Sequence, residues 1–269
     1  MSMGKDNIFL EVKCCNKLMS LVLFRGEMMM KVTGFQSLYQ LTVLPRMFPV
    51  NCYIYEEEDQ LTLIDAGLPN SYKGIVKLIK ECKKPLTNIV LTHGHGDHVG
   101  ALERLKKSFP NAVVSISVRD NRLLRGDTSL DKDEPKTQIK GGIPKGLKVV
   151  PDLLLREGDR VGSLEVYETP GHTPGSISLF DTKNHGIIAG DTFQTRGRIA
   201  VSGQIVRSFP FPAFATWNKE IALKSARKIE ALKPYILAIG HGNVIEKPTE
   251  KIQKAILEAE ENMNMNRVK

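Results

Sequence analysis

The pattern of apolar positions first predicts β structure. Between Gly34 and Gly67, apolar and polar residues alternate loosely at the two-residue period of half-buried strands. The segments that follow this pattern are 38–43, 51–55 and 61–65. The acidic turn 56–59 separates the last two segments, so we expect them to form a hairpin.

A helical period follows and then alternates with further strand-like runs. Between Ser71 and Lys83, apolar residues recur every three or four positions, and lysines occupy the opposite face. Further helices are expected at 99–108, 119–125, 216–232 and 249–261. Further strands are expected at 89–91, 112–118, 153–156, 164–169, 177–180, 186–189 and 235–239. The chain is therefore predicted to be α/β, with its strands and helices in two successive batches.

Size and composition allow a substantial core. The chain has 269 residues, of which 41% are hydrophobic and 25% charged, and this suits one large domain or two fused halves. We expect residues 1–30 to be an N-terminal extension outside the main fold, with Met28, Met29 or Met30 as the true start. The apolar run at 18–24 is too short to span a bilayer, so no membrane association is expected.

The four cysteines show no metal-binding spacing. Cys14 and Cys15 are adjacent in the predicted extension, whereas Cys52 and Cys82 belong to the main domain. We interpret all four as free thiols, which favours a cytoplasmic location. For Cys52 and Cys82, a role as small buried residues is the simplest interpretation.

The chain is basic, with a formal net charge of +8. Such a charge is compatible with a nuclease or phosphodiesterase that acts on an anionic substrate. However, the lysines recur at helical spacing, which is more typical of a solvated outer face than of a nucleic-acid track. We therefore expect a small-molecule substrate and no nucleic-acid partner, and the sequence leaves the oligomeric state open.

The strongest chemical signal is the segment 92–98, which reads THGHGDH and follows an apolar run. In extended backbone, His93 and His95 project to the same side because side chains alternate with period two. Asp97 and His98 would begin the next helix and point in a different direction. One loop can therefore serve two metals, and imidazole with carboxylate suits zinc, iron or manganese.

Three further donors each follow a strand-like run and lie beside glycine: His172, Asp191 and His241. Glycine allows the backbone and the donor side chain to approach a shared ion closely. Together with the four donors of the first motif, they make a set of seven. The remaining histidine, His185, falls in a turn and is expected to be exposed and without a role.

These motifs resemble those of the metallo-β-lactamase superfamily of metallohydrolases, over roughly residues 31–246. The matching segments are 63–67, 93–98, 169–175, 190–192 and 240–242. The resemblance implies an α/β fold, a four-layer αββα sandwich of two mixed β-sheets, with the site at one edge. It also implies that residues 31–269 form a catalytic domain.

The resemblance further implies two divalent metal ions, with zinc expected and iron or manganese as alternatives. One would be held by His93, His95 and His172, the other by Asp97, His98 and His241, and Asp191 would bridge them. Asp65, in the first matching segment, would orient the metal loop; a plain turn or helix-start carboxylate is the alternative interpretation.

The implied activity is hydrolysis of an ester, thioester or lactone. A water shared by two cations loses a proton near pH 7, so a metal-bridging hydroxide would attack the substrate and Asp97 would pass a proton to the leaving group. β-Lactamases of this superfamily carry Cys or Ser where Asp191 stands, whereas glyoxalase II and acyl-homoserine lactonases retain the Asp. The lactonase tyrosine three residues further on is Gln194 here.

Two other classes in the superfamily remain open. A phosphodiesterase or nuclease would use the same donors on an anionic substrate, and a persulfide dioxygenase-like oxidoreductase would use a single iron. Two loops bear on substrate access. The segment 126–148, interrupted by Gly and Pro, is predicted to be a lid over the site or a disordered loop. The aromatic segment 209–217 is predicted to wall a substrate pocket or to pack as a surface loop.

Overall fold

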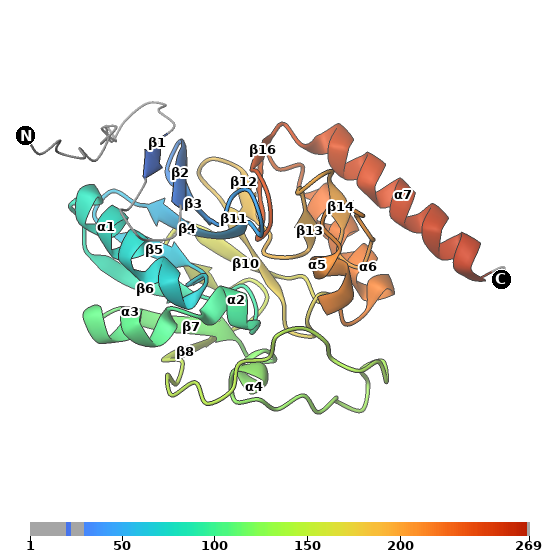
Figure 1. The fold of residues 1–269 in the computed structure, drawn as a ribbon, viewed down its shortest axis with the longest axis horizontal. Helices are drawn as coiled ribbons and strands as arrows, with labels where there is room; N and C mark the ends of the chain where they lie inside the picture. Colours follow the sequence, from blue (N-terminus) through green and yellow to red (C-terminus); the bar gives the residue numbers. More distant parts are fainter. Residues whose placement is uncertain (1–19, 23–29, 268–269) are drawn as a thin grey trace, which may run out of the picture.

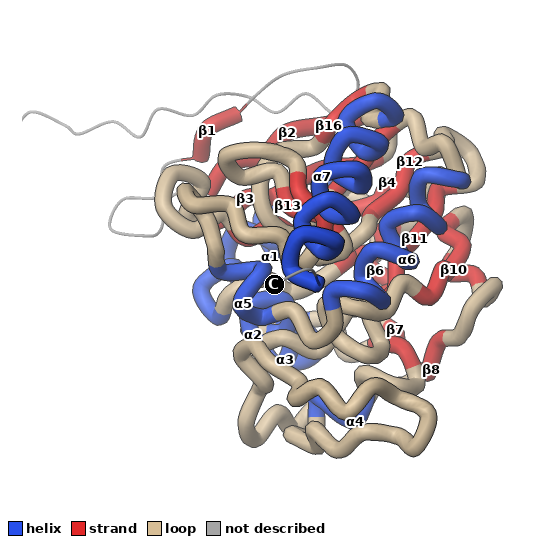
Figure 2. Tube along the Cα trace, turned by 90° about the vertical axis from the view of Figure 1, so that its right-hand side faces the viewer, coloured by secondary structure: helices blue, strands red, loops and turns tan. Residues whose placement is uncertain are grey.

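Two β-sheets lie between two layers of helices in the computed structural model, which describes residues 20–22 and 30–267 (Figure 1). Helices α1 (Tyr72–Cys82) and α3 (Leu102–Ser108) cover the first sheet. Helices α6 (Lys219–Ala231) and α7 (Thr249–Arg267) cover the second, and Figure 2 shows α7 lying beside α6. The predicted four-layer α/β sandwich is confirmed.

The first sheet has eight strands, which follow one another across the sheet in chain order. They are β1 (Ser20–Val22), β2 (Met30–Phe35), β3 (Leu38–Val43), β4 (Val50–Glu56), β5 (Leu61–Ile64), β6 (Leu86–Val90), β7 (Val113–Ser117) and β8 (Leu153–Leu155). Neighbours from β1 to β5 are antiparallel, and those from β5 to β8 are parallel. Parallel neighbours need a crossover connection. Helix α1 provides it between β5 and β6, and α2 (Gly96–Val99) with α3 provides it between β6 and β7.

The second sheet has six strands in the order β16-β15-β12-β11-β10-β9. They are β9 (Arg160–Val161), β10 (Leu164–Glu168), β11 (Ile177–Asp181), β12 (Gly186–Ile188), β15 (Ile236–Ala238) and β16 (Ile245–Glu246). Only β12 and β15 pair in parallel, and α6 lies in the crossover between them. A short ribbon of β13 (Phe193–Gln194) and β14 (Ala200–Val201) stands outside both sheets. Both large sheets therefore contain parallel and antiparallel pairs, so both are mixed, as predicted.

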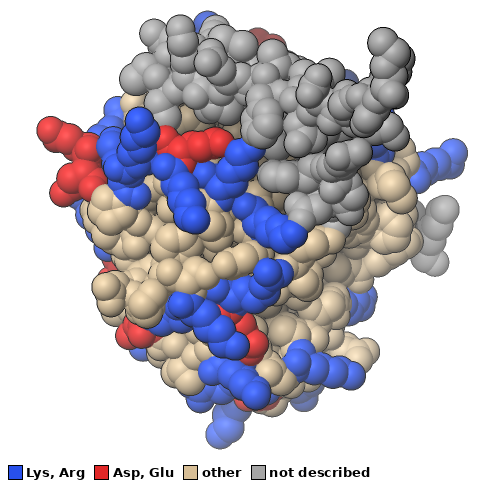
Figure 3. All heavy atoms as spheres, turned by 60° about the vertical axis from the view of Figure 1, so that its left-hand side comes forward, with Lys and Arg blue, Asp and Glu red and all other residues tan. Residues whose placement is uncertain are grey.

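Side-chain alternation along the strands explains the layers. In β4, Ile54 packs beneath α1 and α3, whereas its neighbours Tyr53 and Tyr55 face the second sheet. Helix α1 buries Ile75, Leu78 and Ile79. On the face of the molecule drawn in Figure 3, lysines and arginines are scattered among uncharged and acidic residues, which matches the solvated basic surface expected from the sequence.

Several predicted boundaries differ from the structure. The helix predicted at 99–108 is two helices, because Gly100 packs against the segment after β5: a Cβ there would lie 2.8 Å from the Gly67 carbonyl oxygen. Helix α6 begins only after Asn218, whose side chain accepts hydrogen bonds from Glu220 N and Ile221 N. Two short helices, α4 (Asn121–Leu124) and α5 (Phe211–Ala215), complete the fold.

The predicted N-terminal extension is described only in part. Ser20–Val22 pairs with β2, so these residues belong to the first sheet. The other residues before Met30, including Cys14, Cys15 and Met28, lie outside the described residues, and the division at residue 30 stays a prediction. Cys52 and Cys82 are buried, as expected, and no disulfide joins them. Among the described residues, no helix has the length and apolar character needed to cross a bilayer.

The hydroxyl of Tyr53 is a buried link between the two sheets. It donates to the Ile239 carbonyl at 2.6 Å and accepts from the Ile239 amide at 2.9 Å. Because Ile239 directly follows β15, this pair of hydrogen bonds fixes the end of a second-sheet strand against β4 of the first sheet.

We expect Tyr53→Phe to lower the free energy of unfolding by about 1–3 kcal/mol, since it leaves a buried backbone amide without its partner. Urea denaturation followed by circular dichroism measures the change. The matched control is Tyr72→Phe, whose hydroxyl bonds Ser108 at an exposed position and whose loss should cost less than about 0.5 kcal/mol. Equal losses in the two variants would show that Tyr53 does not link the sheets.

Candidate metal centre

The seven predicted donors meet at one edge of the sandwich, at strand ends from both sheets. His93 and His95 lie in the loop after β6, and Asp97 and His98 lie in the first turn of α2. The other three donors come from the second sheet: His172 between β10 and β11, Asp191 after β12, and His241 after β15. All are buried except Asp97, whose side chain is 25% exposed.

The donors fall into three overlapping groups. Within each group, one ligand atom per residue lies within 4.8 Å of the others. The groups are His93, His95 and His172; His93, His98 and Asp191; and Asp97, His98 and His241. The first and third groups are the two ligand sets that the sequence resemblance implied, and Asp191 lies between them.

The spacing of the donor atoms fits bound cations. Metal–ligand bonds of 2.0–2.1 Å in a tetrahedral site place neighbouring ligands about 3.3 Å apart. Asp191 Oδ2 lies 3.2 Å from His172 Nε2 and 3.1 Å from His241 Nε2, and Asp191 Oδ1 lies 3.5 Å from His98 Nε2. Asp97 Oδ2 lies 3.5 Å from His241 Nε2.

Three donor atoms in the cluster are buried without a hydrogen-bond partner: His93 Nε2, His98 Nε2 and Asp191 Oδ1. A buried polar atom without a partner costs roughly 1–3 kcal/mol, so such atoms are rare in folded proteins. Imidazole nitrogens and a carboxylate that face one another in this way suit divalent transition metals. The residues present therefore fit a metal centre.

Four of the five histidines direct Nε2 into the cluster because an oxygen atom holds their Nδ1. The pairs are His93 with Thr92 Oγ1 at 3.1 Å, His98 with Asp65 Oδ2 at 2.8 Å, His172 with Ser202 Oγ at 3.0 Å and His241 with the Pro49 carbonyl at 2.7 Å. Oxygen partners of this kind fix the orientation of metal-ligating rings. His95 is reversed: its Nδ1 lies 3.0 Å from His172 Nε2, and its Nε2 lies 2.8 Å from the Lys140 carbonyl.

Asp65 makes the contacts expected of a residue that orients the metal loop. Its carboxylate accepts from the Thr92 amide and from the Thr92 hydroxyl, both at 2.8 Å, and it contacts His98 Nδ1 at 2.8 Å. Asp65 has a φ of +61°, a left-handed conformation that places its side chain beneath the loop. These contacts favour the interpretation drawn from the resemblance over that of a plain turn carboxylate.

The sequence interpretation missed Asp120, which joins the two histidine-bearing loops. This buried carboxylate accepts from Gly94 N at 2.9 Å, from Thr173 Oγ1 at 2.6 Å and from Gly175 N at 2.8 Å. Burial raises the pKa of Asp120, and the three hydrogen bonds act against that shift. Its position just after β7 is a strand-end signal like that of the donors, but it has no neighbouring glycine or histidine.

Burial and opposite charges act against each other throughout the cluster. Burial lowers the pKa of His172 to about 3, although Asp191 acts in the other direction. Burial has the same effect on His98, but nearby carboxylates, Asp191 first, raise its pKa to about 10. Burial would raise the pKa of Asp191, but His241, His98 and His172 hold it well below its usual value. A histidine ligates a metal with a neutral ring, so a cation beside His98 would replace a proton.

Asp97 differs from the other six donors in its exposure to solvent. Burial would raise its pKa, but His98 and His241 lower it below the usual value. Asp97 is therefore a carboxylate at neutral pH, at the open side of the cluster. It is the donor best placed to exchange a proton with a bound molecule.

The two loops predicted to control access differ in their contacts. The segment 126–148 has no regular secondary structure, as predicted, and it reaches the cluster through the Lys140 carbonyl. In the aromatic segment, Phe209 lies with its ring centroid 5.5 Å from that of His241. Phe48 also contacts the His241 ring at 5.5 Å, and the partly exposed Phe211 packs against Phe48. Trp217 instead packs on Leu123 and Ile139. His185 is exposed, as expected.

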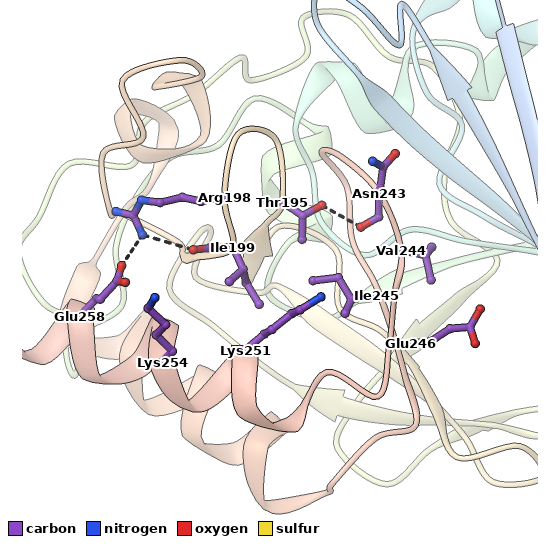
Figure 4. Close-up of a pocket in the computed structure, with 10 residues that line it drawn as sticks. All are labelled: Thr195, Arg198, Ile199, Asn243, Val244, Ile245, Glu246, Lys251, Lys254 and Glu258. Carbon is purple, nitrogen blue, oxygen red and sulfur yellow. Dashed lines mark hydrogen bonds and ion pairs between the residues drawn. The ribbon is translucent and has the colours of Figure 1, made fainter.

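A groove of about 570 Å³ lies next to this centre but is not part of it. It is lined by Thr195, Arg198, Ile199, Asn243, Val244, Ile245, Glu246, Lys251, Lys254 and Glu258, which include none of the seven donors (Figure 4). Arg198 pairs with Glu258 across its wall, and Thr195 donates its hydroxyl to the Asn243 carbonyl. Of the charged side chains in the groove, Arg198 and Glu258 thus neutralise each other.

Comparison with known proteins places this geometry in a family. Residues 45–241 match the model of the "Metallo-beta-lactamase superfamily". The uncharacterized protein YobT of Bacillus subtilis (strain 168) is 56% identical over 230 residues, which cover 86% of this chain and 99% of that protein. The hydroxyacylglutathione hydrolase GloC of Haemophilus influenzae is 28% identical over 204 residues, 73% of this chain and 87% of that protein.

Among solved structures, the crystal structure of TTHA1623 in a di-iron-bound form is similar, with a TM-score of 0.56 and 25% identity. The match covers 76% of this chain and 92% of that one. Family model, relatives and fold agree with the motifs that surround the donor cluster. The chain therefore belongs to the metallo-β-lactamase superfamily.

Proposed function

We propose that this protein is a dinuclear metallohydrolase that cleaves an ester, thioester or lactone. The observation that carries the proposal is the position of Asp191, whose Oδ2 lies 3.2 Å from His172 Nε2 of one group of three donors and 3.1 Å from His241 Nε2 of the other. His93, His95 and His172 would hold one divalent cation, and Asp97, His98 and His241 the other, with Asp191 between them. Zinc is the expected metal, since catalytic zinc sites commonly use imidazole and carboxylate ligands.

In the proposed reaction, the cations and the side chains of the protein would have different roles. Two bound cations would supply a hydroxide nucleophile at neutral pH and polarise the substrate oxygen. The partners of the histidine Nδ1 atoms, such as Asp65 and Ser202, hold the rings in ligating orientation. Asp97, a partly exposed carboxylate, would take up a proton and deliver it to the leaving group.

Two of the similar proteins favour particular candidates for the substrate and for the metal. GloC is named a hydroxyacylglutathione hydrolase, which favours a thioester among the candidate substrates. The di-iron form of TTHA1623 favours iron as the alternative metal. Gln194 is buried and donates to the Phe209 carbonyl at 3.3 Å, so the position of the lactonase tyrosine is occupied by a packed amide. We further propose a small-molecule substrate and a cytoplasmic location.

The proposal is tested by metal analysis followed by a substrate screen. Protein purified without added metal should contain about two zinc ions per chain, as two complete ligand sets require. The metal-loaded protein is then assayed with thioester, lactone, aryl ester, phosphodiester and β-lactam probes, with His95→Ala as the control. Turnover of a carboxylic ester or thioester that His95→Ala loses supports the proposal. A single iron without hydrolysis indicates the dioxygenase, and phosphodiester cleavage alone indicates the nuclease class.

Asp191→Ala should reduce the occupancy of both metals together, because Asp191 Oδ2 lies close to a histidine of each donor group, His172 of the first and His241 of the second. Metal content after dialysis, measured by mass spectrometry, gives the stoichiometry. The matched control is Asp152→Ala, a surface carboxylate paired with Lys106, which should retain both ions. Loss of only one ion from Asp191→Ala would mean that Asp191 does not bridge.

Asp97→Asn should lower kcat by about 100- to 10,000-fold for an alkyl ester, whose alkoxide leaving group needs a proton. The fall should be much smaller for the 4-nitrophenyl ester of the same acid, because nitrophenolate leaves without protonation. Steady-state kinetics on protein of verified metal content measures both values. Equal falls for the two esters would remove the proton-transfer role and leave Asp97 as a ligand only.

A further inference from the structure

One histidine of the cluster has its hydrogen-bond partner in a different part of the fold from the other four. His93, His98, His172 and His241 have their Nδ1 atoms held by Thr92, Asp65, Ser202 and Pro49. Each of these oxygen atoms lies within two residues of a strand end. His95 alone is held by the long irregular segment between α4 and β8, through the Lys140 carbonyl.

This contact requires the unusual backbone of the residues around Lys140. Gly141 has a φ of +95°, and a Cβ at this position would lie only 2.3 Å from His95 Nε2. The next residue, Gly142, accepts a hydrogen bond from the Gly96 amide at 2.7 Å. The loop therefore lies directly on the His95 ring, and only a glycine at position 141 lets it come so close.

The same segment is also fixed on the second-sheet side of the cluster. Ile139 is 6% exposed and packs with Leu123 and Trp217. The Trp217 indole donates to the Thr137 carbonyl at 2.7 Å, and the Trp217 amide donates to the His172 carbonyl at 2.9 Å. The segment thus bridges the loop that carries His95 and the loop that carries His172.

We propose that residues 139–142, here called the strap, hold His95 with Nδ1 toward the first metal and control how tightly that metal is retained. The inference rests on the proposed metal centre. In the strapped arrangement, His95 Nε2–H donates to the Lys140 carbonyl, which leaves the Nδ1 lone pair directed toward His172 Nε2. Release of the strap frees the His95 ring while the other four rings keep their partners.

The strap lies in a segment without regular secondary structure. Segments without regular structure open at lower free-energy cost than the sheet they cover. Because the strap holds the His95 ring directly and touches α2 only through the Gly96 amide, its opening would weaken the first site more than the site of Asp97, His98 and His241. The two metal sites would therefore differ in affinity in a way that depends on residues 139–142.

The test compares two glycine variants of the same loop. Gly141→Ala places a methyl group against His95, whereas Gly146→Ala imposes a similar left-handed strain, with a φ of +74°, at a position with no atom within 4 Å. Zinc affinity of each variant is measured by competition with a chromophoric chelator. Gly141→Ala should bind one of the two zinc ions about 10- to 100-fold more weakly, the usual effect of losing a partner of a metal ligand. Gly146→Ala should bind both as the unmodified protein does.

Two results would overturn the strap. Unchanged affinity of both sites in Gly141→Ala would show that the contact does not act on the metal. An equal loss in Gly146→Ala would show that backbone strain in the loop, not contact with His95, is responsible. If the unmodified protein binds no metal at all, the proposed metal centre itself is wrong, and that outcome is distinct from either of these.

A second measurement needs no variant and remains informative if Gly141→Ala fails to fold. Long-range ¹H–¹⁵N spectra of the zinc-loaded protein report which ring nitrogen of each histidine carries the proton. The strap requires His95 to be protonated on Nε2, while the other four ligand histidines are protonated on Nδ1. Protonation of His95 on Nδ1 would contradict the proposal, because that atom would then be unable to ligate.

Discussion

A set of buried hydrogen bonds between β4 and the segment 239–242 aligns the two sheets, and the metal centre depends on that alignment. The side-chain amide of Asn51 donates to the carbonyls of Ile239 and Gly242, both at 2.8 Å. The backbone amide of Asn51 donates to the Gly240 carbonyl at 2.9 Å. Tyr53 adds two further bonds to Ile239. Since His241 lies inside this segment, the first sheet determines where a donor of the second sheet is placed.

The donor cluster brings together buried donor atoms that protein partners alone do not satisfy. Five buried histidines accompany Asp191, and two of their ring nitrogens, His95 Nδ1 and His172 Nε2, face each other at 3.0 Å. Burial disfavours protonation of most of these rings, while the carboxylates favour it at His98. Cations satisfy both requirements at once, because they pair with the carboxylates and accept the nitrogen lone pairs.

Much of the fold and the meeting of the seven candidate donors could be predicted from the sequence, because both depend on local signals. Glycine-flanked donors at strand ends and a regular apolar period are visible without a structure. Asp120 was missed because its partners, Gly94 and Gly175, are distant in the chain and its own neighbours carry no motif. The split of the helix after Val99 was missed for a similar reason, since it follows from the packing of Gly100 on Gly67. Tertiary contacts between distant residues decide these features.

The identity of residue 191 connects the fold to the proposed chemistry. A carboxylate has two oxygens, and in Asp191 one faces His98 while the other faces His172 and His241. The second of these oxygens thus faces a histidine of each group, and Oδ1 adds a contact to the second group. Cysteine and serine, which β-lactamases of the superfamily carry at this position, offer a single donor atom and lack that added contact. A chain with aspartate here is therefore better suited to hold two cations at a fixed short separation. In the proposed dinuclear site, this carboxylate would hold both cations close enough to share one water.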